Sequence, residues 1–153
     1  MKHVLRTNAL HPDLIALVRE LDAYLRVIDG EEFGFYTQFN QLENIHHAVV
    51  VYDGEIPVAC GALKQYAPGV MEVKRMFTRP AFRGKGMARR VLHELETWAK
   101  ELGYERCILE TGIRQPDAVA LYTKAGYTVI PNYGQYEGVE NSVCFGKDLP
   151  IEK

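Results

Sequence analysis

The chain has 153 residues, of which 47% are hydrophobic and 25% are charged, a composition typical of one globular domain with a substantial core. We therefore expect a single domain over residues 1–153. A formal net charge of −2 argues against a general nucleic-acid-binding protein. The sequence contains no apolar run long enough to span a membrane, and its N-terminus lacks the apolar core of a signal peptide. These features predict a cytoplasmic protein that does not act at a membrane.

The cysteines and histidines give no sign of a metal or redox centre. The three cysteines form no CxxC pair, and each lies in an apolar, strand-like segment, as small core residues of a reducing compartment do. His46 and His47 are neighbours, so on a strand their side chains would point to opposite faces and make a poor chelating pair. The sequence therefore predicts no metal site and no catalytic cysteine.

The first half of the chain predicts helices followed by antiparallel strands. Pro12 and Asp13 open an amphipathic run, because proline is tolerated in the first turn of a helix and aspartate suits the helix dipole. Asp53-Gly54 and Pro68-Gly69 are turn signals between apolar runs. The predicted elements are a strand at 2–7, a helix from 12 to about 27, a short helix at 33–42, and strands at 46–52, 56–66 and 70–78.

The second half alternates helices and strands. Apolar residues recur at helical spacing after residue 86, and we expect one buried stripe there, with charged residues facing water. The stripe consists of Met87, Val91, Leu95, Trp98 and Leu102, and the water-facing side of Arg90, Glu94, Thr97 and Glu101. The remaining elements are strands at 105–110, 127–130 and 142–148, a helix at 116–125 and a loop at 131–141. The order predicts an α/β fold with a mixed, largely antiparallel sheet flanked by helices.

A glycine-rich turn, residues 83–88 with the sequence RGKGMA, lies between the predicted strand 70–78 and the predicted helix 87–102. A glycine turn that opens a helix leaves several backbone N–H groups aimed at one spot, and the helix dipole adds positive potential. Arg83 and Lys85 add charge, while Gly84 and Gly86 let the backbone approach a ligand closely. The turn is predicted to bind a phosphate group; the alternative is a plain helix start with glycines for turning.

These residues resemble the GNAT superfamily of acyl-coenzyme A N-acyltransferases. The family's loop reads Arg/Gln-x-x-Gly-x-Gly/Ala, which residues 83–88 match. A second match covers residues 118–127 (AVALYTKAGY), similar to the family's Ala-x-x-Leu-Tyr-x-Lys-x-Gly-Phe/Tyr signature. Gln115 stands where the family often has asparagine. The order of elements also fits along nearly the whole chain.

The resemblance implies the GNAT fold, with acetyl-CoA as co-substrate and its pyrophosphate on the glycine turn. Backbone groups at Met76, Phe77 and Thr78 would pair with the pantetheine arm like an added strand. A dinucleotide-binding fingerprint fits less well, because Arg89 occupies the place of its third glycine. The implied coenzyme-binding residues are Met76, Phe77, Thr78, Arg83, Gly84, Lys85, Gly86, Met87, Ala88, Arg89, Gln115, Tyr122 and Lys124.

Acyl transfer to an amine needs a base for the amine and an acid for the departing thiolate. Glu72 is the first candidate base, because strand alternation puts Glu72, Lys74 and Met76 on one face and related enzymes can carry a base at this place. Glu110 is the second candidate, and the alternative for Glu72 is a structural ion pair with Lys74 or Arg75.

Tyr122 is the candidate acid, in the position where the family commonly has a tyrosine. A phenol can donate a proton to a thiolate that leaves beside it. The alternative interpretation of Tyr122 is a core aromatic residue at helical spacing. A strand N–H, most plausibly of Met76 or Phe77, would polarise the thioester carbonyl.

Acidic and aromatic residues around position 33 suit a small cationic amine, through charge and cation–π contact. The alternative is an acidic loop in solvent. Gly and Tyr residues at 133–136 would form the opposite wall. The predicted acceptor-binding residues are Glu31, Glu32, Tyr36, Glu110 and Tyr133.

The sequence thus predicts an N-acetyltransferase that acts on a primary amine, most plausibly of a small molecule, by direct attack in a ternary complex. Two other hypotheses stay open at this point. One is a non-catalytic acyl-CoA-binding regulatory module, and the other is a protein N-acetyltransferase. Small members of the family are often dimers, so a homodimer is also possible.

Overall fold

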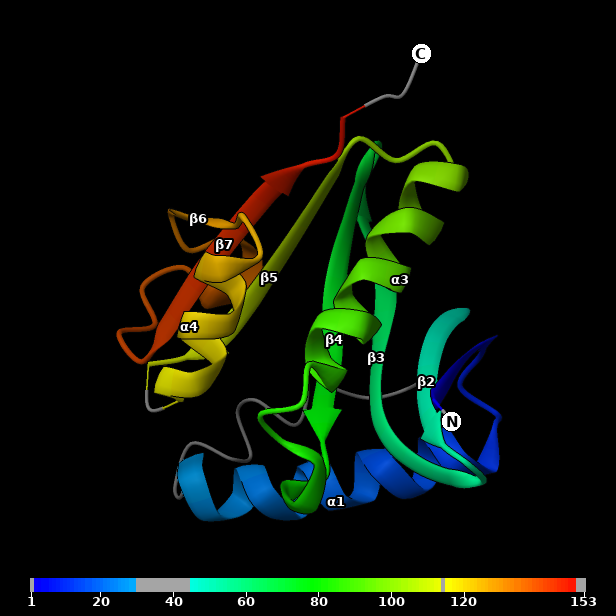
Figure 1. The fold of residues 1–153 in the computed structure, drawn as a ribbon. Coiled ribbons are helices and arrows are strands. Elements are labelled where there is room, and N and C mark those ends of the chain that lie inside the picture. Colours follow the sequence, from blue (N-terminus) through cyan, green and yellow to red (C-terminus); the bar gives the residue numbers. More distant parts are fainter. Residues whose placement is uncertain (1, 30–44, 114, 151–153) are drawn as a thin grey trace.

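In the computed structural model, which describes residues 2–29, 45–113 and 115–150, seven strands form one sheet in the order β1-β2-β3-β4-β5-β7-β6 (Figure 1). Neighbouring strands are antiparallel except β4 and β5, which are parallel. The strands are β1 (Lys2–Thr7), β2 (His47–Asp53), β3 (Ile56–Ala67), β4 (Val70–Thr78), β5 (Arg106–Gly112), β6 (Thr128–Ile130) and β7 (Ser142–Asp148). The helices are α1 (Pro12–Asp29), α3 (Met87–Glu101) and α4 (Pro116–Lys124), with short 3₁₀ turns at Pro80–Phe82 and Gly134–Tyr136.

The predicted mixed α/β sheet is confirmed, and most element bounds agree within two residues. The hairpin turns carry Gly54 and Gly69 with φ of 64° and 78°, the left-handed conformation that glycine adopts without strain. The segment predicted as a loop, 131–141, contains the short 3₁₀ turn Gly134–Tyr136. The predicted helix at 33–42 lies outside the described residues. Within the described part of the chain, no helix is long and apolar enough to cross a membrane.

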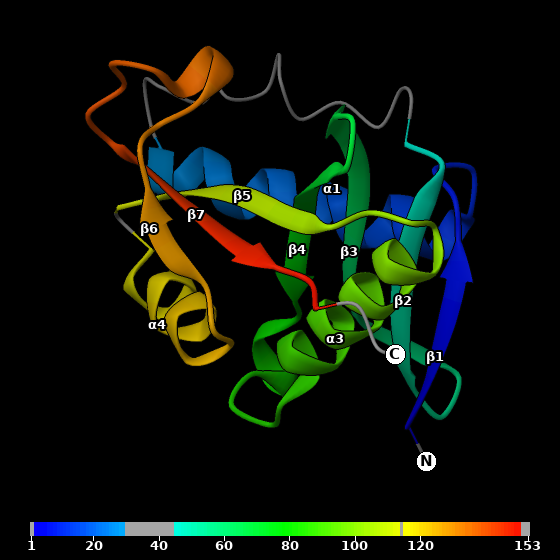
Figure 2. The same ribbon diagram turned by 90° about the horizontal axis from the view of Figure 1, so that it is seen from above.

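Helices cover both faces of the sheet (Figure 2). Helix α1 lies on one face, while α3 and α4 lie on the other. Buried residues of α3 and the sheet form the larger core cluster, and Leu14, Leu17, Val18 and Leu21 of α1 belong to a separate one. The predicted stripe of α3 is confirmed for Met87, Val91 and Leu95, which are buried; Leu102 is 43% exposed because the helix ends at Glu101.

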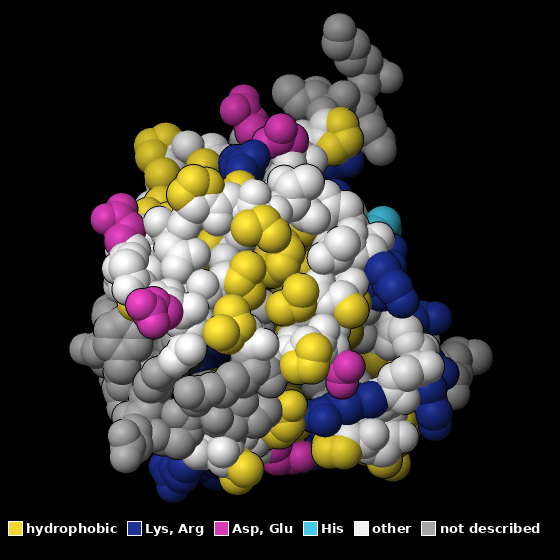
Figure 3. All heavy atoms as spheres, turned by 90° about the vertical axis from the view of Figure 1, so that its left-hand side faces the viewer, with side chains coloured by type: hydrophobic (Ala, Val, Ile, Leu, Met, Phe, Trp, Pro, Cys, Tyr) yellow, Lys and Arg dark blue, Asp and Glu magenta, His cyan; other side chains and the backbone are white. Residues whose placement is uncertain are grey.

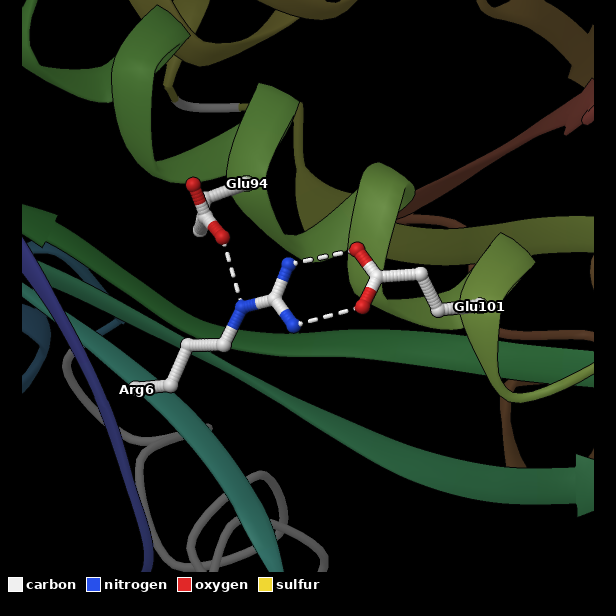
Figure 4. Close-up of polar contacts among 3 residues, drawn as sticks. All are labelled: Arg6, Glu94 and Glu101. Carbon is white, nitrogen blue, oxygen red and sulfur yellow. Dashed lines mark hydrogen bonds and ion pairs between the residues drawn. The ribbon is translucent and has the colours of Figure 1, made fainter.

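The side of α3 predicted to face water is partly used in packing. Arg6 of edge strand β1 donates from Nε to Glu94 at 2.6 Å and from its two terminal nitrogens to Glu101 at 2.9 and 2.8 Å (Figure 4). Its guanidinium carbon also lies 5.0 Å from the ring centroid of Trp98. Helical spacing alone placed these glutamates on the side facing water. It could not show their contact with Arg6, because Arg6 lies on a strand some ninety residues earlier in the chain. The contact ties β1 to α3.

A β-bulge in β4 overturns one sequence prediction. Cys60 pairs with Phe77 and Ala62 with Lys74, so Arg75 and Met76 together oppose Gly61. The extra residue breaks strand alternation. Glu72 and Lys74 share one face as predicted, but Met76 packs in the core cluster beneath α3 on the other face. The prediction that Met76 shares their face is wrong.

Strands β4 and β5 diverge after a short contact. Only Val70–Glu72 pair with Arg106–Ile108, and beyond these residues the two strands separate (Figure 1). The backbone at 73–78 therefore pairs with β3 on one side, while β5 does not continue the sheet on the other. This divergence creates a cleft between the two strands.

Candidate active site

The cleft lies between the diverging parts of β4 and β5 and encloses a cavity of about 110 Å³. Helix α1 contributes Leu21 and Leu25, and α4 contributes Ala118 and Tyr122. The polar and charged residues of the lining come mainly from the two strands. They are Glu72, Lys74 and Arg75 of β4, Glu110 and Thr111 of β5, Gln115 before α4, and Tyr136.

Glu72 is a buried carboxylate at the point where the strands part, with 5% of its surface exposed. The Tyr133 hydroxyl donates to Glu72 Oε2 at 2.7 Å. The Lys74 ammonium lies 3.8 Å from Glu72 Oε1. The ion pair with Lys74 that sequence reasoning left as the alternative is therefore present, but Glu72 also lines the cleft. Arg75, the other partner considered, binds Asp22 of α1 instead.

Lys74 belongs to this site although sequence reasoning used it only as a possible partner. Its side chain is 5% exposed, and burial lowers its pKa, partly offset by the charge of Glu72. Glu110 on β5 also acts on Lys74 electrostatically from across the cleft. The signal for Lys74 is its spacing of two from Glu72 within a strand. Thr111 also lines the cavity, and no sequence pattern marked it. Tyr136 lines the cavity as well, and it belongs to the segment 133–136 that was predicted to form the opposite wall.

Tyr122 lines the cleft from α4 and is 5% exposed. Its ring packs near those of Tyr127 and Phe145, with centroids 5.9 and 6.0 Å away. Burial, and then the nearby charge of Glu110, raises the pKa of the Tyr122 phenol, which therefore stays protonated over the physiological range. Tyr122 is packed in the core and also lines the cleft. Its environment therefore fits both interpretations made from the sequence, a core aromatic residue and a candidate acid.

The glycine turn precedes α3 as predicted. Gly84 and Gly86 have φ of 75° and 80°, and a Cβ added at either would meet no atom within 4 Å. These glycines therefore provide the left-handed backbone and leave open space beside the turn. Gly86 is the N-cap residue of α3, and no side chain caps this end of the helix. The Arg90 N–H donates to the Gly86 carbonyl, the first such bond of the helix. The backbone N–H groups before Arg90 in the first turn therefore have no carbonyl acceptor within the helix. This geometry suits an anion.

The charged residues of the turn take different positions. Arg83 donates from Nε to the Thr78 carbonyl at 3.0 Å, and its guanidinium lies 5.0 Å from the Tyr24 ring centroid on α1. The Lys85 ammonium lies 5.6 Å from the Phe82 ring centroid. Arg89 and Lys124 are exposed. Gln115 is the N-cap residue of α4 and lines the cleft, which its predicted coenzyme contact requires.

The structure brings together Glu72, Glu110, Tyr122 and Gln115 on one cleft, and Tyr133 reaches it through Glu72. The glycine turn lies at the end of the same strand β4, after Thr78. The predicted acceptor residues Glu31, Glu32 and Tyr36 lie outside the described residues. Within the described ranges, no group of three or more His, Cys, Asp or Glu side chains could hold a metal ion.

The sheet is opened between its parallel strands β4 and β5, and the glycine turn follows β4, which is the arrangement that the sequence resemblance implies. The family model of the Acetyltransferase (GNAT) family matches residues 14–127. The chain belongs to the GNAT family, as its sequence motifs indicated, and is an acyl-CoA-dependent N-acyltransferase.

Relatives with known sequences and structures agree with this assignment. A protein described as an IAA acetyltransferase from Azospirillum brasilense is 33% identical over 136 residues, which span 87% of this chain and 88% of that protein. A structure from Klebsiella pneumoniae, assigned as an acyl-CoA N-acyltransferase, superposes with a TM-score of 0.82 at 28% identity and covers 97% of this chain and 98% of that one. The PaiA N-acetyltransferase of Thermoplasma acidophilum, solved in complex with coenzyme A, shares the fold with a TM-score of 0.68 at 16% identity, covering 97% of this chain and 99% of that one.

Proposed function

We propose that the protein transfers the acetyl group of acetyl-CoA to a primary amine of a small molecule, by direct attack within a ternary complex. Residues 1–153 would act as one N-acetyltransferase domain that needs no metal. The observation that carries the proposal is the buried Glu72 carboxylate on the cleft where β4 and β5 part, with Tyr122 lining the same cleft.

The coenzyme is proposed to lie along the diverging part of β4. The open backbone of residues 76–78 suits the amides of a pantetheine arm, which would take the place of a sheet neighbour. The glycine turn suits the pyrophosphate. A neighbour with the same fold was solved with coenzyme A, which supports this choice. The binding residues would be Met76, Phe77, Thr78, Arg83, Gly84, Lys85, Gly86, Met87, Ala88, Arg89, Gln115, Tyr122 and Lys124.

The residues on the cleft would carry out the transfer as follows. Glu72 takes a proton from the acceptor amine, directly or through a water, and so frees the nitrogen lone pair. That nitrogen forms a bond to the carbonyl carbon while the carbon–sulfur bond breaks. The N–H of Met76 or Phe77 stabilises the negative charge on the carbonyl oxygen. Tyr122 gives its proton to the departing sulfur, and the nitrogen loses its second proton as it becomes the amide, which returns a proton to Tyr122 through solvent.

The acceptor is proposed to be a small amine. The carboxylates Glu72 and Glu110 line the cavity against Lys74. Arg75 also lines it, but its charge is paired with Asp22 of α1, so the balance favours a cation. The relative described as an IAA acetyltransferase supports a small-molecule acceptor. The acceptor side would include Glu31, Glu32, Tyr36, Glu110 and Tyr133.

A homodimer and a cytoplasmic location stay part of the proposal. Hydrophobic side chains gather on the face that carries α4 and β6 (Figure 3), where Val129 of edge strand β6 is 68% exposed. Such a patch supports association with a second copy. Light scattering of the protein and of Val129→Glu tests this, because the exposed charge should reduce the mass from dimer to monomer.

Thiol release from acetyl-CoA, measured over a panel of primary amines, IAA and short peptides, tests the function directly. We expect turnover with at least one small amine and none with peptides. If no acceptor in the panel gives thiol release, the proposal is contradicted. Turnover of peptides alone would also contradict it.

The base is tested by comparing Glu72→Gln with Glu110→Gln. If Glu72 is the base, Glu72→Gln lowers kcat/KM at neutral pH by about 10²–10⁴-fold and flattens its rise with pH. Acetyl-CoA binding, followed by calorimetry, stays intact. Glu110→Gln keeps the rise, and the reverse outcome would assign the base to Glu110.

A further inference from the structure

Arg75 has an unusual backbone conformation. It is the residue of the β4 bulge with φ of 60°, and among the described residues no other non-glycine residue has a positive φ. The left-handed region is unfavourable for a residue with a long side chain, and such residues persist only where their surroundings hold them. The Arg75 side chain is only 2% exposed, so its surroundings are the protein itself.

Contacts from two directions hold this residue. Its guanidinium NH2 forms a short ion pair with Asp22 of α1. On the other side, the Cys60 thiol donates to the Arg75 carbonyl at 3.4 Å. Gly61 faces the bulge, and a Cβ there would lie 2.6 Å from Met76 Sδ, so this position must remain a glycine for Met76 to pack.

We propose that Asp22 and Arg75 are a positioning pair: their ion pair fixes the left-handed conformation of residue 75, and thereby the direction of the next amide, Met76 N–H, toward the thioester carbonyl. The inference rests on the proposed function, in which that amide or its neighbour polarises the carbonyl. An oxyanion donor is useful only where it is already aimed, and a bulge re-aims the groups that follow it. Neither side chain touches the substrate in this account.

A second ion pair between the same elements provides a matched control. Arg79 donates from Nε and NH2 to Glu20 of α1, at 3.0 and 2.7 Å to Oε2. This pair also ties α1 to the end of β4, but Arg79 lies outside the bulge and has no left-handed backbone. General docking of α1 would therefore depend on both pairs, whereas aiming of the Met76 amide depends on the Asp22–Arg75 pair alone.

The test compares Arg75→Ala, Arg75→Gly, Asp22→Asn and the control Glu20→Gln by kcat and by KM for acetyl-CoA. We expect Arg75→Ala to lower kcat about 100-fold, the scale of an active-site group displaced by about 1 Å. Arg75→Gly should recover at least tenfold of this loss, because glycine adopts the left-handed region without a tether. Asp22→Asn should lower kcat in the wild-type chain and not in the Arg75→Gly chain, and Glu20→Gln should stay within twofold of the wild type.

Equal losses in Arg75→Ala and Arg75→Gly would overturn the proposal, since they would mean that the guanidinium itself acts on the substrate. Equal losses in Asp22→Asn and Glu20→Gln would also overturn it, in favour of general docking. Backbone chemical shifts and the HN–Hα coupling of residue 75 in the free protein provide a readout without turnover: Arg75→Ala should lose the left-handed signature and Arg75→Gly should keep it. If the wild type transfers no acetyl group, the proposed function fails on its own, while these couplings still decide whether the ion pair fixes the bulge.

Discussion

The paired and diverging parts of β4 and β5 differ in the residues they bury. In the paired part, Val70–Glu72 with Arg106–Ile108, the apolar residues Met71 and Cys107 are almost fully buried, and the buried Glu72 is the last paired residue of β4, at the point where the strands part. In the diverging part, ionisable residues are buried. Counted over the whole residue, Lys74 and Arg75 are 7% and 5% exposed. Each of them has a partner of opposite charge.

The difference separates scaffold from site within a single pair of strands. Apolar residues and ladder hydrogen bonds stabilise the paired part without any specific chemistry. Buried charges add little stability, because their desolvation offsets the attraction of the partner. Buried charges beside a cleft are therefore candidates for binding or catalysis. Substitutions of the apolar residues in the paired part should change stability, and those of Glu72 and of the residues beyond it should change activity.

The largest effect is expected for Met71→Ala in the paired part. Met71 is 2% exposed within the main core cluster, so its truncation should lower the free energy of unfolding by about 2–5 kcal/mol. Urea unfolding measures the loss, with the partly exposed neighbour Val70 changed to Ala as the milder control. The kcat of the folded fraction should be unchanged, and a kcat that falls with stability intact would reverse the roles of the two parts.

Tyr122→Phe should lower kcat by about 100-fold and leave the KM for acetyl-CoA within twofold, because only the proton donor is lost. Tyr127→Phe is the control. Its ring packs 5.9 Å from that of Tyr122 in the same core, but Tyr127 does not line the cleft. Equal effects of the two variants on kcat would mean that Tyr122 serves packing only.

Lys74→Met should lower kcat/KM, because it removes the ammonium that lies 3.8 Å from Glu72 Oε1 on the cleft. The burial that lowers the pKa of Lys74 also means that its charge destabilises the folded state at neutral pH. In the wild type, stability should therefore rise with pH between the lowered pKa and the usual 10.5, and Lys74→Met should lose this rise without a loss of stability at pH 7. Lys2→Met at the far edge strand is charge-matched and should change neither kcat/KM nor the dependence of stability on pH. An unchanged kcat/KM in Lys74→Met would remove Lys74 from the site.

Local patterns were sufficient for most of the fold. The bounds of β4 were predicted to the residue, because Pro68-Gly69 and Arg79-Pro80 limit an apolar run on both sides. The glycine turn was found from its motif, since glycine there is required by backbone conformation. Features of this kind depend on residues that are close together in the sequence, so a local sequence pattern can predict them.

What sequence patterns missed depends on distant residues. The bulge that turns Met76 to the opposite face from Glu72 is set by register with Gly61 of β3, and alternation along β4 cannot reveal it. The hydrogen bond from Tyr133 to Glu72 joins residues 61 positions apart. Both are tertiary facts, and both decide how the predicted site residues face the cleft.

The smallest effect is expected at Arg6, whose contacts test whether polar residues outside the cleft matter for activity. Arg6→Ala should lower the unfolding midpoint less than Met71→Ala does, because the ion pairs of Arg6 are solvent-accessible. The difference between Arg6→Ala and the wild type should shrink at 1 M salt, where the screening length is about 3 Å. The hydrogen bond from Arg6 lowers the pKa of Glu101, so the contribution of this pair should be complete above pH 4.5 and should fade as the pH falls below it. Thermal unfolding at two salt concentrations and at pH 7 and 3.5 measures these dependences, with Arg90→Ala on the exposed side of α3 as control. Acetyl transfer should be unchanged; if it falls as it does for Tyr122→Phe, then buried charge at the diverging strands does not distinguish the site from the rest of the protein.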